Sequence, residues 1–360
     1  MTMKKATILI FALIATTACF SQDKAKNVII FLMDGYRWKE LYQGADSGII
    51  FDHKYNRVDS AYTVKKYWAG DAAQRRKKLM PFVWETMVKK GQLWGNRELG
   101  SQVAVRNKYW FSYPGRSESF CGYYDSAVNS NDYPDNPNLN VLEWIDMQAG
   151  YHSKVATFAS WDAVSRILNR KRNKMPVNIY GEDITGALTP AEEEANRWQH
   201  FMPDIFGAGE RLDAATFALA RAYMVAQHPR VLYIDLGDTD DFAHAGDYGS
   251  YLDAAHNADA MFRDLWELVE SEPFYKDQTA MLVFPDHGRG FGSQWTDHGE
   301  ETPHSNETYF LAMGPGVRVR GEVKGGTPVW QEQYAATIAD VLGLNYVAPH
   351  PVAKGMTLSR

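Results

Sequence analysis

The chain has 360 residues, of which 45% are hydrophobic, and a formal net charge of −6. This apolar content is enough for a large buried core, which excludes extensive disorder. No run of like charges is longer than Arg75 to Lys78, so neither a nucleic-acid-binding surface nor a polybasic membrane surface is indicated.

The first residues have the pattern of an export signal. Two lysines precede an apolar stretch from Ala6 to Ala15, and small residues follow up to Ser21. This order predicts a signal peptide over residues 1–21 and a periplasmic or secreted mature chain that begins near Gln22. The apolar stretch is shorter than the roughly 20 residues that span a bilayer, so we expect no transmembrane segment in the mature chain. Lipidation at Cys19, which would give an outer-membrane lipoprotein, stays an alternative.

Short β-branched or apolar runs occur at Val28 to Met33, Val231 to Leu236 and Met281 to Phe284. Runs of this kind are typical of parallel strands buried on both faces. Helical spacing lies between and after them, in the sets Ala258, Met261, Phe262, Leu265, Leu268 and Val269, and Tyr334, Thr337, Ile338, Val341 and Leu342. The alternation predicts an α/β fold, with a doubly wound, mostly parallel central sheet and helices on both faces.

We expect a single catalytic domain over residues 22–360, in which residues 160–215 could form a cap. The segments from Asp46 to Arg76 and from Asn129 to Asn138 are rich in turn-forming residues and lack clear periodicity. We therefore predict that both are loops over the site.

Polar clusters follow the apolar runs, at the strand ends where such sheets bind ligands. Asp34 follows the first run directly, and it could also be a helix cap. Asp240 and His244 are four residues apart, so one helical turn would project both side chains to the same side. Asp286 and His287 follow the third run, where nearby glycines permit a bend. Imidazole and carboxylate are the usual protein ligands of zinc and similar ions, so we predict a metal site here.

Three serines compete as nucleophile in the string from Phe111 to Gly122, namely Ser112, Ser117 and Ser119. Read alone, this string is also typical of a Pro-Gly turn with exposed hydroxyl groups.

Taken together, these motifs resemble the alkaline phosphatase superfamily over about residues 26 to 345. The branch they are most similar to is the nucleotide pyrophosphatase/phosphodiesterase-like one with its bacterial phosphatase relatives, in which Thr or Ser precedes an aromatic residue and Pro, as in Ser112-Tyr-Pro. The resemblance implies a hydrolase of small phosphoric esters, mono- or diesters, that works through a phosphoserine on Ser112. It also implies two divalent ions, zinc or alternatively manganese. One would be held by Asp240, His244 and a late histidine, and the other by Asp34, Asp286, His287 and Ser112.

The resemblance leaves three residue roles to be decided. The late histidine is His298 or His304, and we favour His298 because its distance to Gly314-Pro315 is close to that in the phosphodiesterases. Asn131 is a candidate for hydrogen bonding a phosphoryl oxygen, although it could be a turn residue. Arg116 departs from the phosphodiesterase pattern and could clamp a non-bridging oxygen as a bidentate donor. Further candidates for recognising substrate charge are Arg37, Lys171 and Arg172.

Two other functions fit parts of the sequence. Ser112-x-Pro-x-Arg116 matches the serine form of the sulfatase motif that is converted to formylglycine. Sulfatases of this superfamily carry paired aspartates after the first strand and bind calcium, whereas Met33-Asp34-Gly35 has one aspartate, and imidazole ligands favour zinc or manganese. The third function is a catalytically silent homologue that binds a phosphorylated or sulfated ligand.

Overall fold

The computed structural model describes residues 24–359. The predicted signal peptide and Cys19 lie outside these residues. Among the described helices, none combines the length and the apolar character needed to cross a membrane.

The main sheet has eight strands in the order β10-β2-β9-β7-β1-β6-β4-β5. Neighbouring strands pair in parallel, except that β9 is antiparallel to both β2 and β7. The bounds are β10 (Gly321–Glu322), β2 (Gly91–Trp94), β9 (Phe310–Met313), β7 (Thr279–Phe284), β1 (Asn27–Met33), β6 (Val231–Leu236), β4 (Val155–Ala159) and β5 (Val177–Asn178). A smaller sheet contains β11 (Val329–Trp330), β3 (Val103–Ala104) and β8 (Glu307–Thr308). The predicted mostly parallel central sheet is confirmed.

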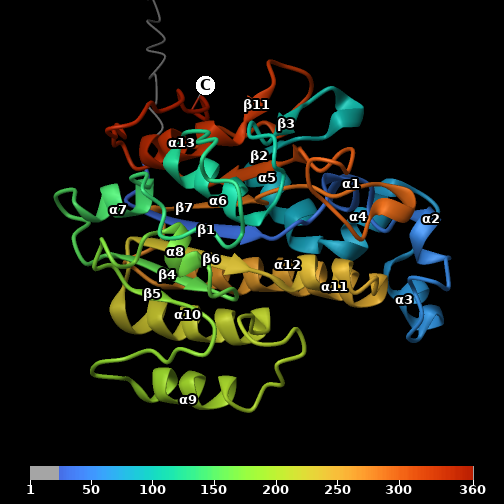
Figure 1. Ribbon diagram of the computed structural model, residues 1–360, viewed down its shortest axis with the longest axis horizontal. Helices are drawn as coiled ribbons and strands as arrows, with labels where there is room; N and C mark the ends of the chain where they lie inside the picture. The colour runs from blue at the N-terminus through green and yellow to red at the C-terminus, as the bar shows by residue number, and fades with distance from the viewer. Residues whose placement is uncertain (1–23, 360) are drawn as a thin grey trace, which may run out of the picture.

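Helices cover both faces of the sheet, and the side chains of β1 alternate between the two cores. Ile29 and Phe31 belong to the core formed with α1 (Trp38–Gln43), α10 (Asp213–Gln227) and α12 (Tyr248–Ser271). Ile30 and Leu32 belong to the core formed with α6 (Ser112–Cys121), α7 (Val141–Asp146), α8 (Val164–Ile167) and α13 (Tyr334–Val341). Figure 1 shows α6, α7 and α13 on one side of the sheet and α10 and α12 on the other. Burial on both faces explains why β1 is a continuous apolar run.

The prediction of a loop from Asp46 to Arg76 was wrong. This segment contains α2 (Ser47–Ile50), α3 (Ser60–Tyr67) and the start of α4 (Ala72–Leu79), which contact α12. The three aspartates that suggested turns are helix N-caps: Asp46, Asp59 and Asp71 accept hydrogen bonds from the backbone N–H groups of Gly48, Tyr62 and Gln74. Each cap satisfies a donor that a helix start leaves without an intrahelical partner. The segment from Asn129 to Asn138 is a loop, as predicted.

Residues 160–215 leave the sheet and return to it. They include α8, β5 at one edge of the sheet, and α9 (Pro190–Gln199), which packs on α10 and forms the outermost layer at the bottom of Figure 1. The segment comes back to the end of β4 through a bridge between Trp161 and Glu210. A cap role for this segment stays a prediction.

Further helical segments are η1 (Val83–Met87), α5 (Val88–Lys90), η2 (Arg97–Leu99), α11 (Asp238–His244), η3 (Gly292–Gln294) and η4 (Gln331–Gln333).

Candidate metal and nucleophile site

The carboxyl ends of β1 and β7 lie side by side and carry Asp34 and Asp286. Asp286 joins the two ends, because its Oδ1 accepts hydrogen bonds from the N–H of Gly35 at 3.2 Å and of His287 at 2.9 Å. Helix α6 starts beside them. A Cβ on Gly115 would lie 2.3 Å from the carbonyl oxygen of Asp286, so only glycine allows α6 to come this close.

Ser112 is the first residue of α6 and lies against the strand ends. Its Oγ is 3.5 Å from Oδ1 of Asp34 and 3.3 Å from Nε2 of His287. Nε2 of His287 is in turn 3.1 Å from Oδ1 of Asp34 and 3.7 Å from Oδ2 of Asp286. All four side chains are buried. We name Asp34, Ser112, Asp286 and His287 the strand-end group.

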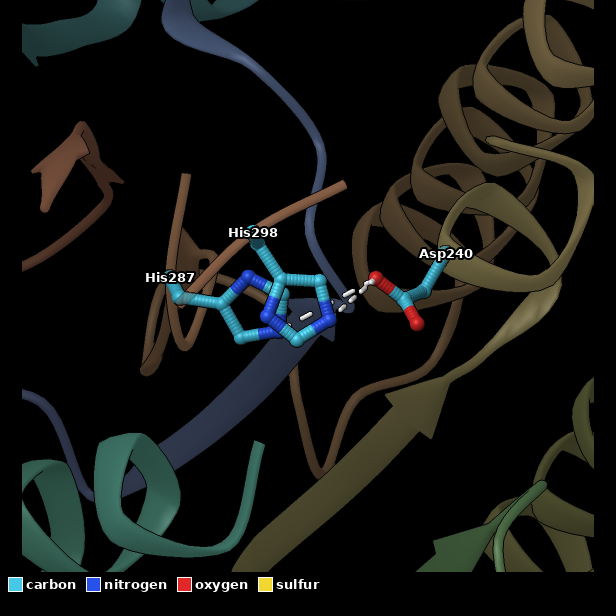
Figure 2. Close-up of side chains that lie close together, drawn as sticks. All are labelled: Asp240, His287 and His298. Carbon is cyan, nitrogen blue, oxygen red and sulfur yellow. Dashed lines mark ion pairs between the residues drawn. The ribbon is translucent and has the colours of Figure 1, made fainter. Parts of the chain in front are cut away.

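A second group adjoins the first and consists of Asp240, His244 and His298, which we name the loop group. Asp240 and His244 lie on α11, one turn apart, as their spacing predicted. Nε2 of His244 is 3.1 Å from Oδ2 of Asp240 and 3.0 Å from Nε2 of His298. The His298 ring stacks on His287 with centroids 3.9 Å apart, and Figure 2 shows both imidazoles directed at the Asp240 carboxylate.

Backbone carbonyl groups orient the two stacked imidazoles. Nδ1 of His287 is 2.8 Å from the oxygen of Gly288, and Nδ1 of His298 is 3.2 Å from the oxygen of Trp110. An Nδ1–H that donates to a carbonyl leaves Nε2 as the ligand nitrogen, which is the usual arrangement of metal-binding histidines. Both Nε2 atoms lie within 4 Å of Oδ1 of Asp240.

Two buried arginines neutralise part of the carboxylate charge. Arg116, one turn after Ser112 on α6, donates to Asp235 at 2.8 Å, to Asp34 at 2.8 Å and also to Asp286. Arg289 donates to Asp240 and to the carbonyl oxygens of Trp295 and Thr296. Arg116 therefore neutralises carboxylates of the strand-end group, and Arg289 neutralises the carboxylate of the loop group.

The pKa values of the three candidate carboxylate ligands shift in different directions. Burial raises the pKa of Asp34, but Arg116 outweighs it and holds this pKa below its ordinary value. Burial likewise opposes ionisation of Asp240, whose pKa Arg289 and His298 hold well below the usual range. Burial raises the pKa of Asp286 to about 7 against the effect of Arg116.

The two stacked imidazoles differ in charge. Burial lowers the pKa of His287, but Asp286 and Asp34 outweigh it and raise this pKa to about 9. Burial and the charge on His287 hold the pKa of His298 well below its usual range. The protonated His287 thus places a positive charge among carboxylates, where a bound cation would take over the same role.

No protein-family model matches the sequence, and no curated protein matches it significantly. Solved structures do match. The alkaline phosphatase PafA aligns at a TM-score of 0.58 and 11% identity, over 93% of this chain and 98% of its own. The phosphonate monoester hydrolase of Agrobacterium radiobacter aligns at a TM-score of 0.58 and 13% identity, over 93% of this chain and 77% of its own. A 2-O GAG sulfatase aligns at a TM-score of 0.55 and 12% identity, over 92% of this chain and 73% of its own.

The chain has the alkaline phosphatase fold. The superfamily resemblance of the sequence is thereby confirmed at the level of the fold, which phosphatases and sulfatases share. At these identities, activity has to be argued from the site itself.

Within the alkaline phosphatase fold, Ser112 is the one of the three candidate serines that joins the strand-end group. Ser117 instead accepts a hydrogen bond from Asn136 inside the core, and Ser119 is completely buried. The late histidine in the loop group is His298. His304 is exposed, bonds to Glu307 at 3.1 Å and stacks on Phe291.

The residues predicted to bind the substrate differ in how they are placed relative to the two groups. Asn131 is next to the nucleophile candidate, because its Oδ1 accepts the N–H of Tyr113 at 2.9 Å. Arg116 is buried among carboxylates, and its role as a clamp for a substrate oxygen stays a prediction. The three weaker candidates form other ion pairs: Arg37 with Glu40, Lys171 with Asp135, and Arg172 with Glu143.

Sequence reasoning missed Asp235 and Arg289. Asp235 had a signal, since it is a charged residue inside the otherwise apolar strand β6, and a buried charge needs a partner. Arg289 follows the Asp286-His287-Gly288 motif, but nothing in the sequence shows that its side chain turns toward Asp240. The chain bends at Asp286, and the glycines of this motif also allow close packing. A Cβ on Gly288 would lie 2.3 Å from the carbonyl oxygen of Glu307, so close backbone packing requires glycine there.

Proposed function

We propose that the chain is an exported two-metal hydrolase of phosphoric esters in which Ser112 is the nucleophile. The observation that carries this proposal is the position of the Ser112 Oγ, within 3.5 Å of both Asp34 and His287, of which His287 in turn stacks on His298 of the loop group. A serine hydroxyl that adjoins two clusters of carboxylate and imidazole groups is the arrangement that metal-assisted attack on phosphorus needs.

The donor atoms fit two divalent ions. Ligand atoms of Asp34, Asp286 and His287 lie within 4.8 Å of one another, as do those of Asp240, His287 and His298. We assign His287 to the strand-end ion, because its Nε2 is 3.1 Å from Asp34 but 3.9 Å from Asp240. His244 then completes the loop group with Asp240 and His298. Three imidazoles favour zinc, or alternatively manganese, over calcium.

The charge of the site also supports two ions. The site has four carboxylates and two guanidinium groups, those of Asp34, Asp235, Asp240 and Asp286 and of Arg116 and Arg289. With all carboxylates ionised and His287 neutral, as a metal ligand must be, two negative charges are left over. Two divalent ions would convert this to two positive charges, which match a phosphomonoester dianion.

The proposed reaction has two steps, formation and hydrolysis of a phosphoserine at Ser112. The Ser112 oxygen attacks phosphorus, the bond from phosphorus to the leaving oxygen breaks, and the alcohol leaves with a proton. Water then hydrolyses the phosphoserine and releases phosphate or, from a diester, a monoester. Bound divalent ions would lower the pKa of the serine hydroxyl and stabilise charge on the attacking and leaving oxygens.

Two features near Ser112 assist this chemistry. As the first residue of α6, Ser112 lies at the positive end of the helix dipole, which favours negative charge on its oxygen. The Asn131 oxygen accepts the N–H of Tyr113, so its amide nitrogen is the end that donates to a phosphoryl oxygen.

A sulfatase is the second candidate, and one observation favours it. Ser112, Pro114 and Arg116 of the Ser-x-Pro-x-Arg motif lie together on α6, and Arg116 binds the candidate ligands Asp34 and Asp286. In this case Ser112 would carry a formylglycine. The three clustered imidazoles favour the phosphatase function.

The proposal is tested by rates on an aryl phosphate, a bis-aryl phosphate and an aryl sulfate, with bound metals quantified in the same sample. We expect turnover of a phosphoric ester and two divalent ions per chain; the faster of the two phosphate substrates identifies a mono- or diesterase. Preference for the sulfate would favour the sulfatase. Metal binding with no turnover of any substrate would favour a silent binding homologue.

A further inference from the structure

The segment before α6 connects the nucleophile to the loop group. It ends at Trp110 and Phe111, directly before Ser112, and the Trp110 carbonyl oxygen accepts the Nδ1–H of His298 at 3.2 Å. Trp110 has a backbone φ of +51°, in the left-handed region that non-glycine residues rarely adopt. Such a conformation is unfavourable for a residue with a side chain and persists only where the surroundings hold it in place.

Asn107 holds this conformation. Its side-chain oxygen accepts the backbone N–H groups of Tyr109 at 2.9 Å and Trp110 at 3.1 Å. These are local turns of the kind that asparagine side chains form with the backbone. Asn107 is buried, so the loss of its oxygen would leave two N–H groups without this acceptor.

Glu118 in turn fixes Asn107. One carboxylate oxygen of Glu118 accepts both the backbone N–H and the side-chain amide of Asn107, each at 2.8 Å. The other accepts the N–H of Arg106 at 2.7 Å and of Glu332 at 3.2 Å. Because Glu118 lies on α6, the helix that begins with Ser112 also anchors the segment that orients His298.

We propose that Asn107 is a positioning residue for His298. Through the turn at Tyr109 and Trp110 it directs the Trp110 carbonyl at Nδ1 of His298, so that Nε2 faces Asp240 and His244. This inference rests on the proposed function, in that it takes the loop group as a metal site. In this role Asn107, which lies outside every predicted motif, controls the affinity for the metal ion of the loop group.

The test is Zn²⁺ binding, measured by chelator competition on the metal-free chain. Asn107→Ala should weaken one of the two Zn²⁺ sites about tenfold, at the low end of what loss of a partner of a metal ligand costs. Asn107→Ser should lie between Asn107→Ala and the unchanged chain, since a serine hydroxyl makes the same turn more weakly. The second Zn²⁺ site should keep its affinity in both variants.

Asn136→Ala is the matched control. Asn136 is also a buried asparagine beside α6, where it donates to Ser117, but it makes no hydrogen bond to residues 106–110. It should lower the thermal stability of the metal-free chain and leave both Zn²⁺ affinities unchanged. Equal losses of Zn²⁺ affinity in Asn107→Ala and Asn136→Ala would mean a general structural effect and overturn the inference.

Two further outcomes separate this inference from the proposed function. If the unchanged chain binds two Zn²⁺ and Asn107→Ala binds them equally tightly, the positioning role is wrong while the two-metal site stands. If the unchanged chain binds no Zn²⁺ or Mn²⁺, the proposed function itself fails and the positioning role with it. Should Asn107→Ala not fold, Asn107→Ser carries the same comparison.

Discussion

The strand-end group and the loop group use the same chemistry but are built differently. Asp286 and His287 are completely buried and follow a central strand, whereas the His244 side chain is 43% exposed and lies at the end of the short helix α11. Packing of the sheet and of α6 therefore fixes the strand-end group. The loop group depends on individual hydrogen bonds, from Arg289 to Asp240 and from His298 to Trp110. We expect changes at the strand ends to affect folding and chemistry, and changes in the loop group to affect mainly metal affinity.

The largest expected effect is on the nucleophile. Ser112→Ala should lower turnover of a phosphoric ester by at least about 1000-fold, because the oxygen that forms the covalent bond is lost. Bound metal, measured in the same sample, should stay at two ions per chain. Ser119→Ala, the same change about two turns further along α6, should leave turnover unchanged. Full activity of Ser112→Ala would remove Ser112 from the mechanism.

Removal of Arg116 should show how the strand-end group depends on buried charge. Arg116→Gln leaves Asp34, Asp235 and Asp286 without their common partner. Loss of one partner of a buried ion pair costs about 3–5 kcal/mol, so urea unfolding of the metal-free chain should show a loss of that size. Arg221→Gln breaks the exposed pair with Asp264 and should cost less than about 1 kcal/mol. Similar losses in the two variants would contradict the account of the strand ends.

The pH dependence of stability should reveal the buried Glu118, which anchors the segment next to His298. Burial raises the pKa of Glu118 to about 7 from an ordinary 4.5. A raised carboxyl pKa gives stability that is fully present below pH 4.5 and is lost as the pH rises through 7. The free energy of unfolding of the unchanged chain, relative to Glu118→Gln, should therefore fall over this range by no more than about 3 kcal/mol. A difference between the two proteins that does not vary with pH would show that Glu118 titrates normally.

The smallest expected effect separates the two late histidines. His298→Ala should weaken one metal site about 100-fold, at the upper end of the cost of losing a ligand's own partner. His304→Ala should leave the metal affinities of both sites unchanged, because His304 bonds to Glu307 and stacks on Phe291 and not on a residue of the loop group. Metal titration of both variants decides the assignment, and the reverse result would exchange their roles.

The same contrast explains what the sequence could predict. The apolar runs predicted β1, β6 and β7 closely, because strands buried on both faces are mostly apolar, with Asp235 in β6 as an exception. The strand-end residues Asp34 and Asp286 followed from their position after those runs. The hydrogen bonds that shape the loop group join residues far apart in the chain, such as Arg289 with Asp240 and Trp110 with His298. No spacing rule predicts such pairs. The prediction of a loop at the aspartates that cap α2, α3 and α4 was wrong because helix caps and turns use the same residues.

The most direct test of the central claim is the mass of the peptide that contains Ser112 after a rapid acid quench during turnover of an aryl phosphate. We predict a fraction of this peptide heavier by one phosphoryl group, with the added mass on Ser112, and no adduct in Ser112→Ala. A formylglycine at position 112 in the chain purified from its native host, or turnover with the phosphoryl group on another residue, would contradict the account.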